Sequence, residues 1–333
     1  MSLKSKAVHL KKYAHLASEF SPRISLSTGL TNAYPYSSHS NALGWKITQY
    51  HHNGILSWLN KHYGTFLDGS TPVESVIDRF ERTPPPGAAC VRKNRTIWTM
   101  WWQGQDDAPA LVKACLSSIK SHHGDFDFVC LDQKNISQYV ILPDHILSKR
   151  MKGQISLAHL SDIVRMYLLY HYGGLWLDAT TYVIHDIESE ILNNGFFTCR
   201  NIAQKNEFVS RAEWAGNAIG MECGSNIAGS ILSCFYEYWD KHDTLVVYLL
   251  SDYLLALLFS HNTAAAALFQ KIPINNIRRN ELAASLNAPY DPSFFNERPD
   301  TTLYKLNWKR SYKERSDEGK ETFYHYLLSH ASR

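Results

Sequence analysis

The sequence predicts an α/β fold: a mixed, mainly parallel sheet flanked by helices, with a helical extension at the N-terminus. Residues 96–131 follow the order strand, helix, strand, a spacing typical of parallel pairing in such a sheet. Residues 155–178 follow the order helix, glycine pair, buried strand. Before residue 90 the apolar residues show only helical spacings, which predicts a separate helical region.

The composition fits a folded enzyme-sized protein and excludes several classes. At 333 residues, the chain can form one large α/β domain or two smaller ones. Its 44% hydrophobic and 20% charged residues argue against disorder. A net charge of +3 is too small to indicate a nucleic-acid partner. Six scattered cysteines without a CxxC pair indicate reduced thiols rather than a disulfide framework or a zinc site.

No targeting or membrane-spanning segment stands out. The basic N-terminus lacks the apolar core of a signal peptide. The most apolar stretch, residues 245–259, contains Ser251 and Asp252 and is too short to cross a bilayer, so it predicts a buried helix. The sequence therefore predicts a cytoplasmic protein. Its slight positive charge also allows peripheral contact with acidic lipids at the inner membrane face.

The first 90 residues carry the least information. Helices are expected at residues 3–19, 55–62 and 73–80, and the polar residues 21–41 are expected to form a loop. Residues 84–86 are consecutive prolines, which lack amide donors and hold the chain extended. We therefore expect an N-terminal helical extension over residues 1–90 and the α/β domain over residues 91–333.

The α/β region opens with a strand expected at residues 96–101. Pro109 then lies in the first turn of a helix that ends near residue 120, a position where proline is tolerated. The next elements are expected to be a strand at residues 126–131, a short strand at 139–142 and a short helix at 143–149.

Residues 155–186 carry two acids and an arginine toward one point. Asp162 and Arg165 are three residues apart and therefore share a face of the expected helix. Gly173 and Gly174 end this helix, because glycine adopts the left-handed conformation at little steric cost. Asp178 follows the strand at residues 175–177, at the carboxyl end where open α/β sheets bind ligands.

The rest of the chain is expected to complete the sheet and its helical cover. A strand is expected at residues 196–199, and residues 214–219 are expected to be a strand or a loop of the active site. Two helices are expected at residues 227–241 and 245–260. A short strand at residues 303–308 precedes a charged loop and the final segment, residues 322–330.

Several motifs occur in order along residues 96–333. They include the stretches IWTMWWQG, SDYLL and TFYHYLLSH, together with LDAT at residues 177–180. The helix before LDAT contributes Ala158, Ser161, Asp162, Arg165, Gly173 and Gly174. This set closely resembles the catalytic core of glycosyltransferases with a DXD sugar-binding motif, and most nearly the capsular polysaccharide synthesis group of glycosyltransferase family 32.

The resemblance implies the GT-A nucleotide-sugar transferase fold. It also implies retaining transfer of a hexose or N-acetylhexosamine from a nucleotide-diphosphate sugar, a UDP-sugar above all, to a bacterial capsular polysaccharide or lipid-linked glycan. No residue can be named as a nucleophile, and a front-side displacement needs none. Two alternatives stay open: transfer to a protein side chain, and a nucleotide-sugar- or glycan-binding protein without turnover.

The expected catalytic residues are Asp178, Asp162 and Arg165. By resemblance, Asp178 holds a divalent metal, Mn²⁺ or Mg²⁺, that neutralises the departing diphosphate, because hard cations favour oxygen ligands. Thr180 stands where the familiar motif has a second acid, so another group has to complete the metal shell. His330 is selected for this role over Asp186 and His325, although histidines in a chain with sixteen are more often surface or core residues.

By resemblance, Asp162 and Arg165 hydrogen-bond hydroxyls of the donor sugar. A carboxylate accepts from two adjacent hydroxyls, and the arginine fork donates to oxygens and steadies the acid. The alternative is an ordinary ion pair within the helix, but the helix is expected to be buried over most of its surface. Gly174 and Thr180 belong to the same motifs and are also assigned to donor binding.

Tryptophans at the end of the first strand are further donor-binding candidates. By resemblance, Trp101 stacks on the nucleobase, and Trp102 is the second candidate. Strand alternation places Trp98 and Trp102 on one face and Trp101 on the other. Asp252 is expected either to contact the site or to pin its helix. A basic segment is expected either to close over the diphosphate or to remain solvated; its residues are Lys305, Trp308, Lys309 and Arg310.

Overall fold

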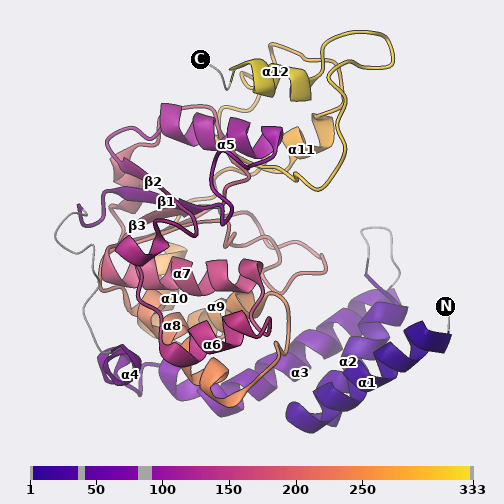
Figure 1. Ribbon diagram of the computed structural model, residues 1–333, viewed down its shortest axis with the longest axis vertical. Helices are drawn as coiled ribbons and strands as arrows, with labels where there is room; N and C mark the ends of the chain where they lie inside the picture. Colours follow the sequence, from indigo (N-terminus) through magenta and orange to yellow (C-terminus); the bar gives the residue numbers. More distant parts are fainter. Residues whose placement is uncertain (1–2, 37–41, 82–91, 331–333) are drawn as a thin grey trace.

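The computed structural model describes residues 3–36, 42–81 and 92–330. It confirms the predicted fold class, a mixed α/β architecture with helices on both sides of a mainly parallel sheet (Figure 1). The consecutive prolines at residues 84–86 lie outside the described residues. Within the described part, no helix is both long and apolar enough to cross a membrane.

The central sheet has five strands in the order β2-β1-β3-β6-β5. β1 pairs in parallel with β2 on one side and with β3 on the other, as the strand–helix–strand spacing predicts. β6 runs antiparallel to both β3 and β5. The strands are β1 (Thr96–Met100), β2 (Asp127–Leu131), β3 (Gly174–Leu177), β5 (Phe196–Thr198) and β6 (Ala218–Met221).

A second sheet contains only two short antiparallel strands, β4 (Thr181–Val183) and β7 (Leu303–Lys305). The expected strand at residues 303–308 therefore ends at Lys305. In this ladder Thr181 lies opposite Lys305, and Val183 lies opposite Leu303. The backbone amide of Leu306 extends the pairing by donating to the carbonyl of Thr180 at 2.9 Å. The ladder joins the turn after β3 to a segment more than a hundred residues later.

Helices cover the sheet on both faces (Figure 1). On one side lie α5 (Ala110–Ser121), α11 (Glu281–Ser285) and α12 (Phe323–His330), of which α12 packs against α5. On the other side lie the helices α6 to α10, of which α8 packs against α6, α7 and α9. They are α6 (Asp144–Met151), α7 (Leu157–His171), α8 (Asn226–Lys241), α9 (Leu250–His261) and α10 (Thr263–Gln270).

Among the described residues before the sheet there are four helices: α1 (Leu3–Glu19), α2 (Pro22–Ala33), α3 (Ala42–Leu67) and α4 (Val73–Phe80). The prediction of a loop at residues 21–41 is wrong, because α2 occupies most of this range. Ser21 is the N-cap of α2, and its hydroxyl accepts from the amide of Ile24 at 3.2 Å. Pro22 occupies the first turn, where its missing amide hydrogen costs nothing.

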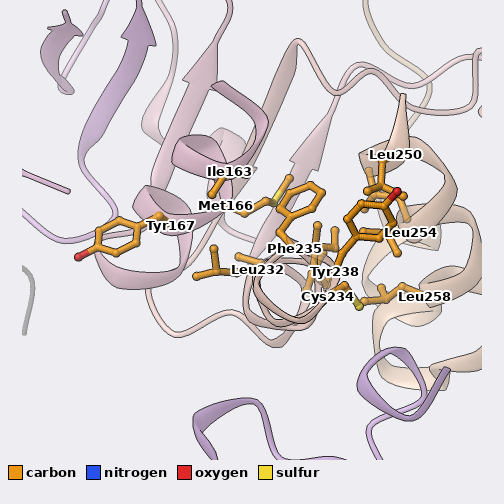
Figure 2. Close-up of a cluster of buried hydrophobic side chains, with 14 of the residues drawn as sticks. Ile163, Met166, Tyr167, Leu232, Cys234, Phe235, Tyr238, Leu250, Leu254 and Leu258 are labelled. Carbon is orange, nitrogen blue, oxygen red and sulfur yellow. The ribbon is translucent and has the colours of Figure 1, made fainter. Parts of the chain in front are cut away.

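The largest core lies between α7, α8 and α9. Figure 2 shows apolar side chains of all three helices meeting there, among them Ile163, Met166, Leu232, Phe235, Leu254 and Leu258. The same cluster continues to Leu16, Ile55 and Leu59 of the N-terminal helices, because α3 packs against both α8 and α9. The division of the chain near residue 90 stays a prediction, and the helices before it share this core.

Two expected elements near the core are wrong in detail. Residues 139–142 form no strand, since a short 3₁₀ turn at Ile136–Gln138 leads into them and Tyr139 offers its carbonyl to the hydroxyl of Tyr172 at 2.8 Å. The helix expected from residue 245 begins at Leu250. The amide of Val246 donates instead to the hydroxyl of Tyr238 at 2.7 Å. The cysteines of the described part are free thiols.

Candidate functional site

The glycine pair after α7 sets the position of β3. Gly173 has φ +68° and Gly174 has φ +103°, conformations that L-residues with a side chain rarely adopt. A Cβ on Gly174 would also overlap the carbonyl oxygen of Thr96 in β1. The two glycines therefore let β3 begin directly beside β1, and Asp178 directly follows the strand at the carboxyl edge of the sheet.

Arg165 bridges the two acids that the sequence singled out. Its Nη1 donates to Asp162 Oδ1 at 3.0 Å, and its Nη2 donates to Asp178 Oδ1 at 3.2 Å. The guanidinium also lies over the ring of Trp176, 5.1 Å from the ring centroid. Only 6% of the Arg165 side chain is exposed, so both ion pairs are largely shielded from water. The three expected catalytic residues thus form one cluster.

Asp178 has two further partners. The indole Nε1 of Trp176 donates to Asp178 Oδ1 at 2.9 Å. Lys305 Nζ donates to Asp178 Oδ2 at 2.6 Å and to Thr180 Oγ1 at 2.8 Å. Burial alone would raise the pKa of the Asp178 carboxyl, but the charges of Lys305 and Arg165 outweigh it and hold the pKa below its usual range. Asp178 is therefore a carboxylate at neutral pH.

A buried histidine, His159, lies behind Asp162. The indole of Trp239 can only donate, and its Nε1 lies 2.8 Å from His159 Nε2. His159 Nε2 is therefore the acceptor, and its Nδ1 carries the proton that faces Asp162 Oδ2 at 3.5 Å. Asp162 thus accepts a hydrogen bond from Arg165 on one side and faces the His159 ring, without a hydrogen bond, on the other.

Asp252 lies behind the same cluster. Its Oδ1 accepts from the indole Nε1 of Trp214 at 3.2 Å. Burial raises the pKa of Asp252 to about 6, the nearby charge of Asp162 adds to the increase, and the Trp214 hydrogen bond and the charge of Arg165 partly oppose it. Asp252 therefore both pins α9 to the segment before β6 and shares the electrostatic environment of the site.

The tryptophans after β1 divide between the two faces of the sheet. Trp98 is fully buried in the large core and Trp102 packs against that core, whereas Trp101 packs with buried Ala179 on the other face. This is the division that strand alternation predicts. Trp101 meets Trp308 edge to face, with ring centroids 5.4 Å apart. Its indole nitrogen is buried without a hydrogen-bond partner among the described residues.

Other predicted site residues do not join the cluster. Gly174 lies at the amino end of β3, the opposite end from Asp178. His330 is exposed at the end of α12, with its ring centroid 3.9 Å from that of Tyr326 and its Nδ1 2.9 Å from the Tyr326 carbonyl oxygen. Asp186 pairs with His122 at 3.0 Å. His325 pairs with Glu314 at 3.3 Å. Lys309 and Arg310 are exposed.

The donors around Asp178 do not fit the expected divalent metal. In the described part of the chain, no group of three or more His, Cys, Asp or Glu side chains is arranged to hold a metal ion. The Asp178 carboxylate and the Thr180 hydroxyl are both hydrogen-bonded by Lys305, whose positive charge would repel a second cation. The metal itself stays a prediction.

The cluster is open to solvent at the edge of the sheet. The side chains of Asp178 and Lys305 are 28% and 30% exposed, so each has one face open to solvent. A cavity of about 430 Å³ between α3, α9 and α10 touches the cluster only through Trp214, and neither Asp178 nor Lys305 lines it. The open faces of Asp178 and Lys305, with Trp101 and Trp308 nearby, are therefore the candidate donor site.

Sequence reasoning missed three members of this arrangement. Trp176 was expected only as a buried strand residue, and its hydrogen bond to Asp178 follows from alternation, since residues two apart in a strand share a face. His159 lies three residues before Asp162 on the same helix face, a spacing that could have revealed it. Nothing in the sequence signals Trp239, which reaches His159 from another helix.

Comparison with known proteins identifies both a family and several relatives. The model of the family described as capsular polysaccharide synthesis protein matches residues 41–327, most of the chain and all of the cluster around Asp178.

Three fungal proteins are similar to part of the chain. They are the O-glycosyltransferase braB of Annulohypoxylon truncatum (27% identical over 107 residues), the glycosyltransferase afumC of Aspergillus fumigatus (27% over 104) and the probable glycosyltransferase FCK3 of Fusarium pseudograminearum (28% over 140). The matches cover 29%, 28% and 38% of this chain, respectively. They span 25%, 27% and 34% of the relatives, so the likeness concerns a minor part of each.

Proposed function

Since this chain belongs to the family of capsular polysaccharide synthesis proteins, we propose that it is a glycosyltransferase. It transfers a hexose or N-acetylhexosamine from a nucleotide-diphosphate sugar, a UDP-sugar above all, to a polysaccharide or lipid-linked glycan. The names of the three relatives support the transferase activity, and the family description supports a polysaccharide acceptor. Because these relatives are fungal, the bacterial setting that the sequence suggested is not part of the proposal.

One observation carries the proposal: Arg165 lies between Asp162 and Asp178, at 3.0 Å and 3.2 Å, at the carboxyl edge of the sheet. An ordinary surface ion pair would involve one acid and an exposed arginine, and would contribute little to stability. Here a buried arginine holds two carboxylates at the position where α/β sheets bind nucleotides and sugars. Such an arrangement is costly to desolvate, which favours a role in binding over a role in stability.

Each residue has a defined part in the transfer. Asp162, steadied by Arg165, accepts hydrogen bonds from hydroxyls of the donor sugar. Trp101 stacks on the nucleobase, and Trp308, which meets it edge to face, closes that side. Retention follows from front-side displacement, in which the protein positions the reactants and stabilises the departing diphosphate without a nucleophile of its own.

A panel of nucleotide sugars tests this proposal through thermal stabilisation. A ligand that binds only the native state raises the melting temperature, so one UDP-sugar should stabilise the protein. The effect should be lost in Asp162→Asn, which keeps the size of the side chain. The matched control is Asp127→Ala, which removes an acid paired with Arg92 on the exposed surface. If no nucleotide sugar changes the melting temperature, the donor assignment is wrong.

Release of free UDP separates a transferase from a protein that only binds. Without acceptor, a transferase hydrolyses its donor slowly, and the free diphosphate can be measured directly. Turnover that disappears in Asp178→Asn supports catalysis. Stabilisation by a UDP-sugar with no release of UDP, at any pH from 5 to 9, would instead support the alternative of a nucleotide-sugar-binding protein.

A further inference from the structure

Lys305 is fixed against Asp178 by backbone pairing. It lies opposite Thr181 in the β4–β7 ladder. Its own amide donates to the carbonyl of Arg279 at 2.8 Å, and the next amide, of Leu306, donates to the carbonyl of Thr180 at 2.9 Å. The backbone on both sides of Lys305 is therefore held, so the side chain extends from a strand rather than from a mobile loop. Its ammonium lies between Asp178 Oδ2 and Thr180 Oγ1, at 2.6 Å and 2.8 Å.

The charged side chains around Asp178 have a net charge of zero. In the familiar motif, two carboxylates and one divalent cation have a net charge of zero. Here the second acid is replaced by Thr180, and one acid with one lysine also sums to zero. Asp162 and Arg165 form a second neutral pair. Without Lys305, the cluster of Asp162, Arg165 and Asp178 would be negative and would repel a diphosphate.

Lys305 also has the donor that a phosphate needs. An ammonium carries three N–H donors. Contacts within the described residues use two of them, to Asp178 and Thr180, and 30% of the side chain is exposed. The remaining donor is free to bind an oxygen of a ligand at the open edge. Asp178 and Thr180 then act as supports that hold the ammonium in place.

We propose that Lys305, in place of a divalent metal ion, binds and neutralises the diphosphate of the nucleotide-sugar donor. This inference rests on the proposed function. In the transfer, the bond between the anomeric carbon and the diphosphate oxygen breaks, and its electron pair stays with the diphosphate. The acceptor hydroxyl forms the new bond to that carbon and passes its proton to the departing phosphate oxygen. Lys305 stabilises the charge that develops on this oxygen.

The first experiment measures UDP release before and after removal of metals with EDTA. The rate should change by less than about twofold, and added Mn²⁺ should not raise it further, because the charge is supplied by Lys305. Lys305→Met, which keeps the length of the side chain, should lower the rate by about 100-fold or more. The affinity of the Lys305→Met variant for UDP, measured by calorimetry, should fall by about tenfold or more. Its affinity for uridine, which lacks phosphate, should change little. Lys313→Met is the matched control, since Lys313 pairs with Asp317 at 2.7 Å on the exposed surface.

The second experiment restores the two-acid arrangement. Thr180→Asp combined with Lys305→Ala places two carboxylates at residues 178 and 180 and removes the competing cation. This double variant should bind Mn²⁺ in a titration followed by electron paramagnetic resonance, whereas the unmodified protein should not. It should also recover UDP release only when Mn²⁺ is present. This readout does not depend on the stability of Lys305→Met.

The possible failures are distinguishable. Loss of UDP release with EDTA and its recovery with Mn²⁺ in the unmodified protein would overturn the role of Lys305 and leave the proposed function intact. Full UDP release by correctly folded Lys305→Met would do the same. A protein that neither binds nor hydrolyses any nucleotide sugar, with or without Mn²⁺, would overturn the proposed function itself.

Discussion

Replacing Trp176 by phenylalanine removes one hydrogen bond of the Asp178 carboxylate and keeps an aromatic ring beneath the Arg165 guanidinium. Trp176 is 1% exposed, and its Nε1 donates to Asp178 Oδ1 at 2.9 Å. A hydrogen bond to a charged group contributes about 1.5–3 kcal/mol, and the smaller ring leaves a gap that costs about 1–2 kcal/mol more. Because Asp178 is partly exposed, water replaces part of the lost bond. We therefore expect Trp176→Phe to lower the free energy of unfolding by about 3 kcal/mol.

Trp98→Phe is the matched control. Trp98 lies directly opposite Trp176 in the β1–β3 ladder, is equally buried, and donates from its Nε1 to the uncharged carbonyl of Gly173 at 2.9 Å. Loss of a neutral hydrogen bond and a similar gap should cost about 2 kcal/mol. The two variants thus make the same change in the same core, but only one of them touches Asp178.

The assay is UDP release as a function of pH, with urea unfolding in parallel. Trp176 stabilises the charged form of Asp178, so its removal raises the pKa of that carboxyl. A carboxylate that protonates at a higher pH loses function earlier on acidification. The acidic limb of the Trp176→Phe profile should therefore move to higher pH, while that of Trp98→Phe stays in place. Identical profiles for the two variants would refute the reasoning.

Two further predictions concern stability. Burial raises the pKa of Asp252 to about 6, whereas the unfolded chain releases this proton from about pH 4. Between these two pH values the native state binds more protons than the unfolded state. The free energy of unfolding therefore falls as the pH rises through this range. Asp252→Asn should then raise the free energy of unfolding by about 2 kcal/mol at pH 7, and urea unfolding should show no gain at pH 4. Gly174→Ala should cost more than about 3 kcal/mol, because its Cβ would overlap the Thr96 carbonyl, whereas Gly153→Ala, with positive φ but open space, should cost about 1 kcal/mol. Equal urea midpoints for the two glycine variants would contradict this.

Local patterns predicted the unit that carries the site. Three patterns lie within one short continuous segment: the helical period of α7, the glycine pair and the short strand before Asp178. The convergence of Asp162, Arg165 and Asp178 could therefore be predicted from local geometry. The parallel pairing of β1 and β2 followed from the strand–helix–strand spacing. These predictions depend on contacts between residues close in sequence, for which period and turn chemistry are informative.

The parts that sequence reasoning missed depend on distant contacts. β4 and β7 have three residues each, too few for a period, and pair across more than a hundred residues. The sequence therefore left two alternatives open for Lys305: a flap that closes over the diphosphate, or a solvated surface. The helix α2 was missed for another reason: Ser21 and Pro22 are start signals, but the polar composition of residues 21–41 outweighed them. His330 was chosen from its motif, which carries no information on where its ring lies.

The β4–β7 ladder also governs when the site can exist during synthesis. The elements up to β3 can close early, since their contacts are short in sequence, whereas the ladder must wait for residues 303–305 to leave the ribosome. Until then, Asp178 has Arg165 beside it but lacks its lysine. A nascent chain therefore acquires this charge pattern only after β7 has been synthesised, although Asp162, Arg165 and Asp178 are in place more than a hundred residues earlier.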